Sequence, residues 1–177
     1  LYWRPRRFLH RADSLSKVVD RHDFSISKAN FNRLARMFGP FSVDAFASAS
    51  NATVVRYFSQ YNDVQSAGWD AFAQDWSREH LYILPPFTRS CFGRILDKIQ
   101  CDKASGLLII PVWTKDPWFR RLFSQMKQWI AKSLTFTGSF VKTNSEDCFF
   151  GSEFECRLRI VVLRPPHTLS SCSNLRG

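Results

Sequence analysis

Two short segments of the sequence combine residue types that could do chemistry on a nucleoside. The first, Val43 to Ser48, has the pattern of a strand and carries Asp44, whose carboxylate we expect at the carboxyl end of that strand. A carboxylate there can accept hydrogen bonds from a ribose or an amino group, which is how open α/β sheets hold nucleoside-containing cofactors. An aspartate at a strand end is also a common turn or capping residue. Asp44 is therefore either a cofactor-binding residue or a turn or capping residue.

The second segment is a short apolar strand that runs into two prolines and an aromatic residue. It ends in Leu84, Pro85, Pro86 and Phe87. Consecutive prolines stiffen the turn and leave carbonyl groups that no neighbouring amide easily claims. The segment predicts either a rigid recognition loop or a rigid loop that only covers the core.

The charge of the chain is unevenly distributed. Its 177 residues carry 25 lysines and arginines against 15 acidic residues, a net charge of +10. Residues 41–116 hold seven basic and eight acidic side chains, so the excess lies outside them. Segments of one sign usually meet a polyanion, most often nucleic acid, and the alternative is a solvated helix face with a disordered basic tail. The candidate nucleic-acid contacts are Arg4, Arg6, Arg7, Arg11, Arg120, Arg121, Lys127 and Lys132, with Trp113 and Trp118 as stacking surfaces.

Other residue types exclude some functions. The tryptophans Trp76 and Trp129 are predicted to be core residues. The histidines and cysteines lack the spacing of zinc ligands, so no metal site is predicted. An odd number of cysteines without a closely spaced pair favours reduced thiols in the nucleus or cytoplasm. No stretch approaches the 18 or so apolar residues of a membrane helix, so no membrane partner is predicted.

The elements that must position these residues follow from the apolar periodicity. It predicts helices over 27–38, 90–100 and 117–132, and strands over 41–47, 81–84, 107–111, 134–137 and 158–163. Asp116 is the predicted N-cap of the third helix, and Ile95 and Ile109 are predicted core residues. Strands that alternate with helices indicate an α/β sheet with right-handed crossovers and a site at the carboxyl ends of the strands. The last strands predict a closing antiparallel pair.

A series of short motifs occurs in fixed order over roughly half of the chain. The motifs are Phe38–Ser48, Asn51, Arg56–Ser59, Asp70–Phe72, Asp75–Trp76, Leu84–Phe87, Ile110–Trp113 and Pro117–Phe119. The series resembles the phage-type Dam-like adenine methyltransferases, and more closely the copy of that domain in the polyproteins of DIRS-like, tyrosine-recombinase retrotransposons. The resemblance implies a Rossmann-like, methyltransferase-type sheet flanked by helices, with a C-terminal antiparallel hairpin.

The resemblance also gives Leu84–Phe87 a role. In that family the tetrapeptide begins with Asp or Asn, whose side chain accepts a hydrogen of the adenine amino group together with the next proline carbonyl, and its aromatic residue stacks on the flipped base. Here Leu84 accepts nothing, and no glycine lies in residues 43–50, where the family has a Gly-rich turn. We therefore expect a module without a cofactor, and leave binding of S-adenosylmethionine to Asp44 and the Pro85 carbonyl open.

Upstream, residues 10–17 resemble the end of a retroelement ribonuclease H, in which Asp13 takes the place of a metal-binding carboxylate. One carboxylate cannot build a two-metal site, so Asp13 is interpreted as a junction marker. The predicted organisation is a basic lead-in over 1–26, a methyltransferase-like domain over 27–164 and a disordered tail over 165–177.

Three functions follow from these patterns. The first is a retroelement-derived, catalytically degenerate module that binds nucleic acid or scaffolds a nucleoprotein assembly, with other domains of a reverse-transcriptase polyprotein as partners. The alternatives are an active S-adenosylmethionine-dependent adenine methyltransferase and a domesticated protein-interaction domain.

Overall fold

The computed structural model describes residues 24–136, 141–143 and 157–166. Its helices are α2 (Lys28–Phe38), α3 (Arg89–Asp102) and α4 (Pro117–Ser124), with short 3-10 turns η2 (Ala71–Ala73) and η3 (Lys127–Trp129). Its strands are β1 (Phe24–Ile26), β2 (Val43–Ala47), β3 (Tyr57–Ser59), β4 (Gly68–Trp69), β5 (His80–Ile83), β6 (Ser105–Pro111), β7 (Ile130–Phe136), β8 (Val141–Thr143) and β9 (Leu158–Leu163).

Seven strands form one mixed sheet in the order β4-β3-β2-β5-β6-β9-β7, and β1 pairs with β8 in a separate ribbon. The first five strands of this order are parallel, and β9 runs antiparallel between β6 and β7. The chain moves outward from β2 to β3 and β4, then returns to β5 on the other side of β2. This reversal places a topological switch point between β2 and β5, where open α/β sheets bind ligands. The Rossmann-like, methyltransferase-type sheet and its closing antiparallel strands are confirmed.

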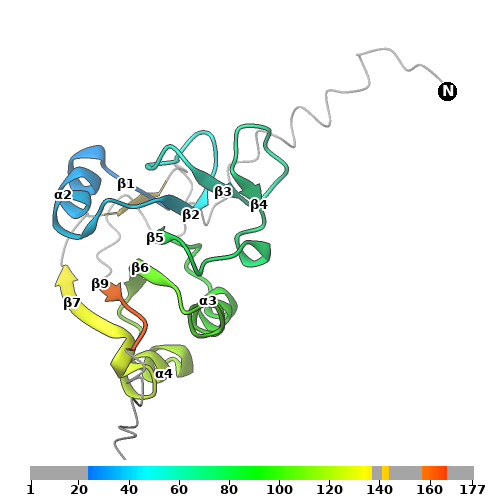
Figure 1. Cartoon of the computed structure of the whole chain (residues 1–177). Helices are drawn as coiled ribbons and strands as arrows, with labels where there is room; N and C mark the ends of the chain where they lie inside the picture. Colours follow the sequence, from blue (N-terminus) through cyan, green and yellow to red (C-terminus); the bar gives the residue numbers. More distant parts are fainter. Residues whose placement is uncertain (1–23, 137–140, 144–156, 167–177) are drawn as a thin grey trace, which may run out of the picture.

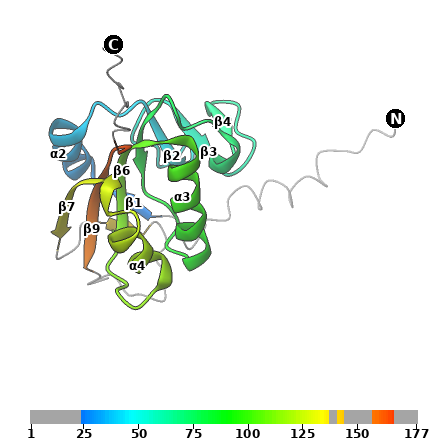
Figure 2. The same ribbon diagram turned by 60° about the horizontal axis from the view of Figure 1, so that its bottom comes forward.

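Helices cover the sheet on both faces. α2 lies against one face, and α3 and α4 pack together on the other (Figures 1 and 2). This sandwich explains why β6 is an uninterrupted apolar run, since a central parallel strand is buried on both sides. Ile95 on α3 and Ile109 on β6 are both fully buried, as predicted.

The predicted end of the third helix is wrong. The third helix ends at Ser124 and not near Lys132, because the chain turns through η3 into β7 at Ile130. Its apolar stripe misled the prediction because Met126 lies in that turn and is fully buried, so core burial continues where helical geometry has stopped. Asp116 is the N-cap of α4 by position, but its side chain makes no capping hydrogen bond.

Several predictions fall partly outside the described residues. Residues 1–23 and 167–177 are among those that the structure does not describe, so the lead-in, the tail and the division into 1–26, 27–164 and 165–177 stay predictions. Within the described ranges, no helix has the length and apolar content needed to cross a membrane.

Candidate active site

The loop that follows β2 closes in a short polar turn. The Ser48 amide donates to Oδ1 of Asn51 at 2.7 Å, and the Asn51 amide donates to the Ser48 carbonyl at 3.2 Å. In the described chain, φ is positive at Asp70, Lys103 and Gly106 and nowhere in this turn. A glycine is required where the backbone is left-handed, so this turn needs none. The turn after β2 is therefore formed without backbone strain although it contains no glycine.

Asp44 lies at the second position of β2, so the prediction that it sits at the carboxyl end of the strand is wrong. Its carboxylate is buried, and Oδ2 accepts from the amide and the hydroxyl of Thr53 at 3.1 and 2.8 Å. Burial, with the charge of Asp44 as the smaller cause, holds the pKa of the neighbouring Tyr82 well above its ordinary value. Asp44 thus anchors the loop between β2 and β3, and its contact with a cofactor stays a prediction.

Leu84, the residue that directly follows β5, lies inside the core. Its exposed fraction is 6%, and it belongs to the same apolar cluster as Tyr82 and Phe87. The Pro86 carbonyl accepts from the Thr88 amide at 2.8 Å, so one of the two proline carbonyls is already used. The Pro85 carbonyl, which is the second acceptor that the resemblance implies, has no hydrogen bond within the described ranges.

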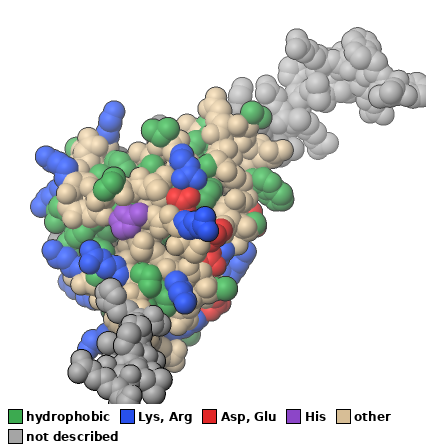
Figure 3. Space-filling model, viewed as in Figure 1, with side chains coloured by type: hydrophobic (Ala, Val, Ile, Leu, Met, Phe, Trp, Pro, Cys, Tyr) green, Lys and Arg blue, Asp and Glu red, His purple; other side chains and the backbone are tan. Residues whose placement is uncertain are grey.

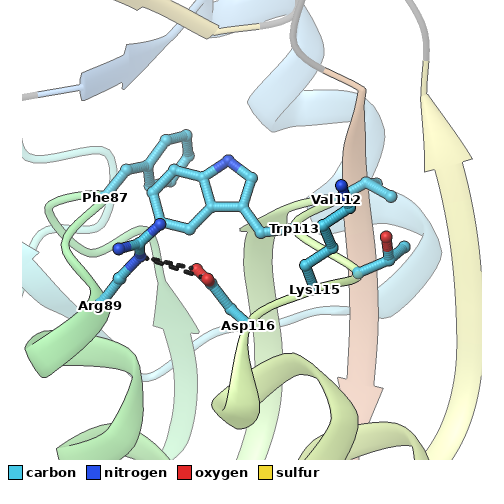
Figure 4. Close-up of a pocket in the computed structure, with 7 residues that line it drawn as sticks. Phe87, Arg89, Val112, Trp113, Lys115 and Asp116 are labelled. Atoms are coloured by element: carbon cyan, nitrogen blue, oxygen red, sulfur yellow. Dashed lines mark hydrogen bonds and ion pairs between the residues drawn. The ribbon is translucent and has the colours of Figure 1, made fainter.

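An open pocket of about 520 Å³ lies where β5 and β6 end and α3 and α4 begin. Its lining consists of Phe87, Arg89, Val112, Trp113, Thr114, Lys115 and Asp116. Figure 4 shows the Asp116 carboxylate turned toward Arg89, and the Arg89 Nε lies 3.2 Å from it. This ion pair explains why Asp116 does not cap its own helix. Aromatic walls with the exposed Lys115 at the rim fit a planar base that carries a phosphate.

The tryptophans divide between this pocket and the core. Trp113 is partly exposed and lines the pocket. Trp118 is only 6% exposed and stacks on Phe92 at a ring distance of 4.2 Å, so the prediction that it offers a stacking surface to nucleic acid is wrong. Trp76 and Trp129 are buried, as predicted.

The predicted basic contacts are not equivalent. Arg120, Lys127 and Lys132 are exposed, whereas the Arg121 guanidinium is held by Asp97 on α3 at 2.6 Å. The structure therefore assigns Arg121 a role in joining α3 to α4. The four arginines Arg4, Arg6, Arg7 and Arg11 lie outside the described residues.

Sequence reasoning missed Arg89, Lys115 and the pocket role of Asp116. Arg89 and Asp116 are far apart in the chain, and only the parallel pairing of β5 with β6 brings the two helix starts together. Each of these residues follows a predicted parallel strand, and this position in the sequence could have identified it as a candidate pocket residue.

Comparison with known proteins agrees with this geometry. A model of the family described as DNA N-6-adenine-methyltransferase (Dam) matches residues 13–169. No curated protein matches the chain. The matched range includes the sheet, the switch point and the pocket, and the sheet order is that of a methyltransferase. The chain therefore belongs to the Dam family of DNA N6-adenine methyltransferases.

Proposed function

We propose that this domain binds S-adenosylmethionine and an adenine of DNA where β2, β5 and β6 end, and that its methyl-transfer step is slow. The observation that carries the second part is Leu84, a buried hydrocarbon side chain at the position of the family's polar acceptor. Family membership supports the first part, because Dam enzymes use this cofactor and act on DNA. The proposed domain therefore binds both the cofactor and the adenine, and only its methyl-transfer step is slow.

The residues around the switch point fit the cofactor. The hydroxyls of Ser48 and Ser50 lie 2.9 Å apart in the turn after β2. These small polar side chains would hold ribose and amino-acid groups without blocking their approach. When bound, the cofactor supplies an electrophilic methyl group.

The chain's own residues would then act on the base. Phe87 and Trp113 provide surfaces on which adenine can stack, and the Pro85 carbonyl can accept one amino hydrogen. Leu84 leaves the other hydrogen without an acceptor. By analogy with loss of one oxyanion-hole donor, this lowers the rate about 100- to 1,000-fold.

Titration with S-adenosylmethionine tests the binding part. We expect saturable binding by calorimetry, weakened about tenfold by Asn51→Ala because the turn after β2 loses the oxygen that closes it. The matched control is Asn62→Ala, an exposed asparagine outside the turn. Absence of saturable binding to the unmodified protein contradicts the cofactor part, and rapid methylation of DNA by that protein contradicts the slow-transfer part.

Trp113 in the pocket and Trp118 in the core provide a second test. Trp113→Ala should weaken binding of adenine-containing single-stranded DNA about 5- to 150-fold, since base stacking contributes about 1–3 kcal/mol. Trp118→Ala should mainly lower the melting temperature, because Trp118 stacks within the core. Anisotropy and thermal melting measure both effects. Equal loss of affinity in the two variants at unchanged stability contradicts this assignment.

We further infer that the domain functions beside the polymerase and ribonuclease H domains of a retroelement polyprotein. The motif series between Phe38 and Phe123 and the segment 10–17 support this context. In such an assembly, a domain that binds nucleic acid contributes even when its chemistry is slow.

A further inference from the structure

The outer side of α2 carries basic side chains and no acidic one. Lys28, Arg33 and Arg36 are exposed, while Leu34 on the opposite side of the helix is buried in the core. The helix sequence from Lys28 to Phe38 contains no Asp or Glu. The sequence analysis used this helix only for its apolar stripe, so its charged side received no role.

Among the described residues, the cations of α2 have no carboxylate partner, and they lie together on one helix. Four other basic residues form ion pairs: Arg56 with Glu79, Arg89 with Asp116, Lys98 with Asp102 and Arg121 with Asp97. In the described part of the chain, neither the three cations of α2 nor Lys132 forms one. Their positive charge is therefore not neutralised locally.

Strand β7 extends the same basic area. The Lys132 Nζ lies 5.6 Å from the ring centre of Phe38, the last residue of α2. Figure 3 shows lysine and arginine side chains gathered on the side where Figure 1 places α2 and β7, and the acidic side chains visible in that view lie away from it. An open hollow lined in part by Asn32 and Arg36 adds an amide donor beside the charge.

We propose that Lys28, Arg33, Arg36 and Lys132, here called the α2 basic face, bind the phosphate backbone of nucleic acid without reading its sequence. This surface is separate from the pocket, because α2 covers the opposite face of the sheet from α3 and α4 (Figure 2). From Lys28 to Arg36 the helix rises about 12 Å, which corresponds to about three or four base-pair steps. Arginine, lysine and asparagine side chains are the usual donors to phosphate oxygens.

The chemistry favours nucleic acid over a membrane surface. A membrane-binding helix needs a broad exposed apolar side, whereas the apolar stripe of α2 faces the core, and Met37 is its one large exposed hydrophobic residue. The chain belongs to a family of DNA-modifying enzymes, so a phosphate backbone is the polyanion that it meets. The carbonyl of Phe38, at the end of α2, accepts from His80 at the start of β5, whereas the ring centre of Phe31 lies 5.2 Å from that of Tyr82 further along β5, so α2 begins nearer the pocket edge of the sheet than it ends.

The salt dependence of duplex binding tests the α2 basic face. In anisotropy titrations of the full chain, Arg33→Gln with Arg36→Gln should reduce the slope of log affinity against log salt by about 1.8, or about 0.9 for each lost phosphate contact. The control pair is Arg78→Gln with Lys103→Gln, which removes the same charge from exposed residues elsewhere and should change the slope by less than about 0.5. Duplex DNA and duplex RNA are tested in parallel to distinguish the two sources of phosphate backbone.

The charge-preserving pair Arg33→Lys with Arg36→Lys should restore most of the slope, which excludes damage to the fold as the cause. Equal reductions in the α2 and control pairs, an unchanged slope in the α2 pair, or no salt-dependent binding by the unmodified protein would each overturn the proposal. Calorimetry with S-adenosylmethionine keeps this test separate from the proposed function, because the α2 variants should bind the cofactor like the unmodified protein.

Discussion

Replacing Leu84 by asparagine should raise methyl transfer to adenine about 100- to 1,000-fold above the unmodified protein. The substitution restores a side-chain oxygen beside the Pro85 carbonyl, so both hydrogens of the amino group gain an acceptor. The turn after β2 contains no left-handed residue, so it is formed without strain although it lacks a glycine. Transfer of a radiolabelled methyl group to DNA measures the rate.

Leu84→Ala is the matched control, since it removes the same hydrocarbon without adding an acceptor. It should leave transfer as slow as in the unmodified protein. Both variants make space in the core, so their melting temperatures and cofactor affinities must be compared before the rates. An asparagine variant that binds cofactor and DNA normally yet transfers no faster contradicts the assignment of the slow step to Leu84.

Ile109→Asp should abolish cooperative folding. Ile109 is fully buried in the middle of β6, which is paired on one side with β5 and on the other with β9. A carboxylate placed there would lie among buried apolar side chains, and an unpaired buried charge costs several kcal/mol, a large fraction of the stability of an ordinary domain. Thermal melting followed by circular dichroism should show no sharp transition.

The control for this variant is Val55→Asp. Val55 is 97% exposed, so the carboxylate introduced there stays in contact with water. Its melting temperature should stay close to that of the unmodified protein. A cooperative transition for Ile109→Asp near the same temperature would mean that β6 is not the central strand of the sheet.

The sequence predicted the fold best where burial leaves a regular pattern. The apolar stripe that contains Ile95 predicts a helix, and the continuous apolar run around Ile109 predicts a central strand on which that helix packs. Both residues are fully buried, as predicted. Strands β1, β3, β4 and β8 were missed because elements of two or three residues show no periodicity. The end of α4 was missed because Met126 remains buried after the helix stops.

The site was predicted only where one continuous segment makes it. Leu84–Phe87 was identified as a unit and lies after β5, at the switch point. Asp44 and Trp118 were misplaced because residue type does not tell whether a polar or aromatic side chain faces solvent or the interior. The pairing of Arg89 with Asp116 depends on strand register, which the sequence alone does not reveal.

The two outer strands of the sheet affect whether this protein aggregates at high concentration. Aggregation by strand addition needs a long, flat edge with free backbone groups. One outer strand, β4, has only two residues, so the exposed Tyr61, Val64 and Trp69 around it are not backed by an edge that could template a further strand. The other outer strand of the described sheet, β7, is longer but carries the exposed ammonium group of Lys132. Short length at one edge and charge at the other should keep separate copies of the chain from joining sheet to sheet.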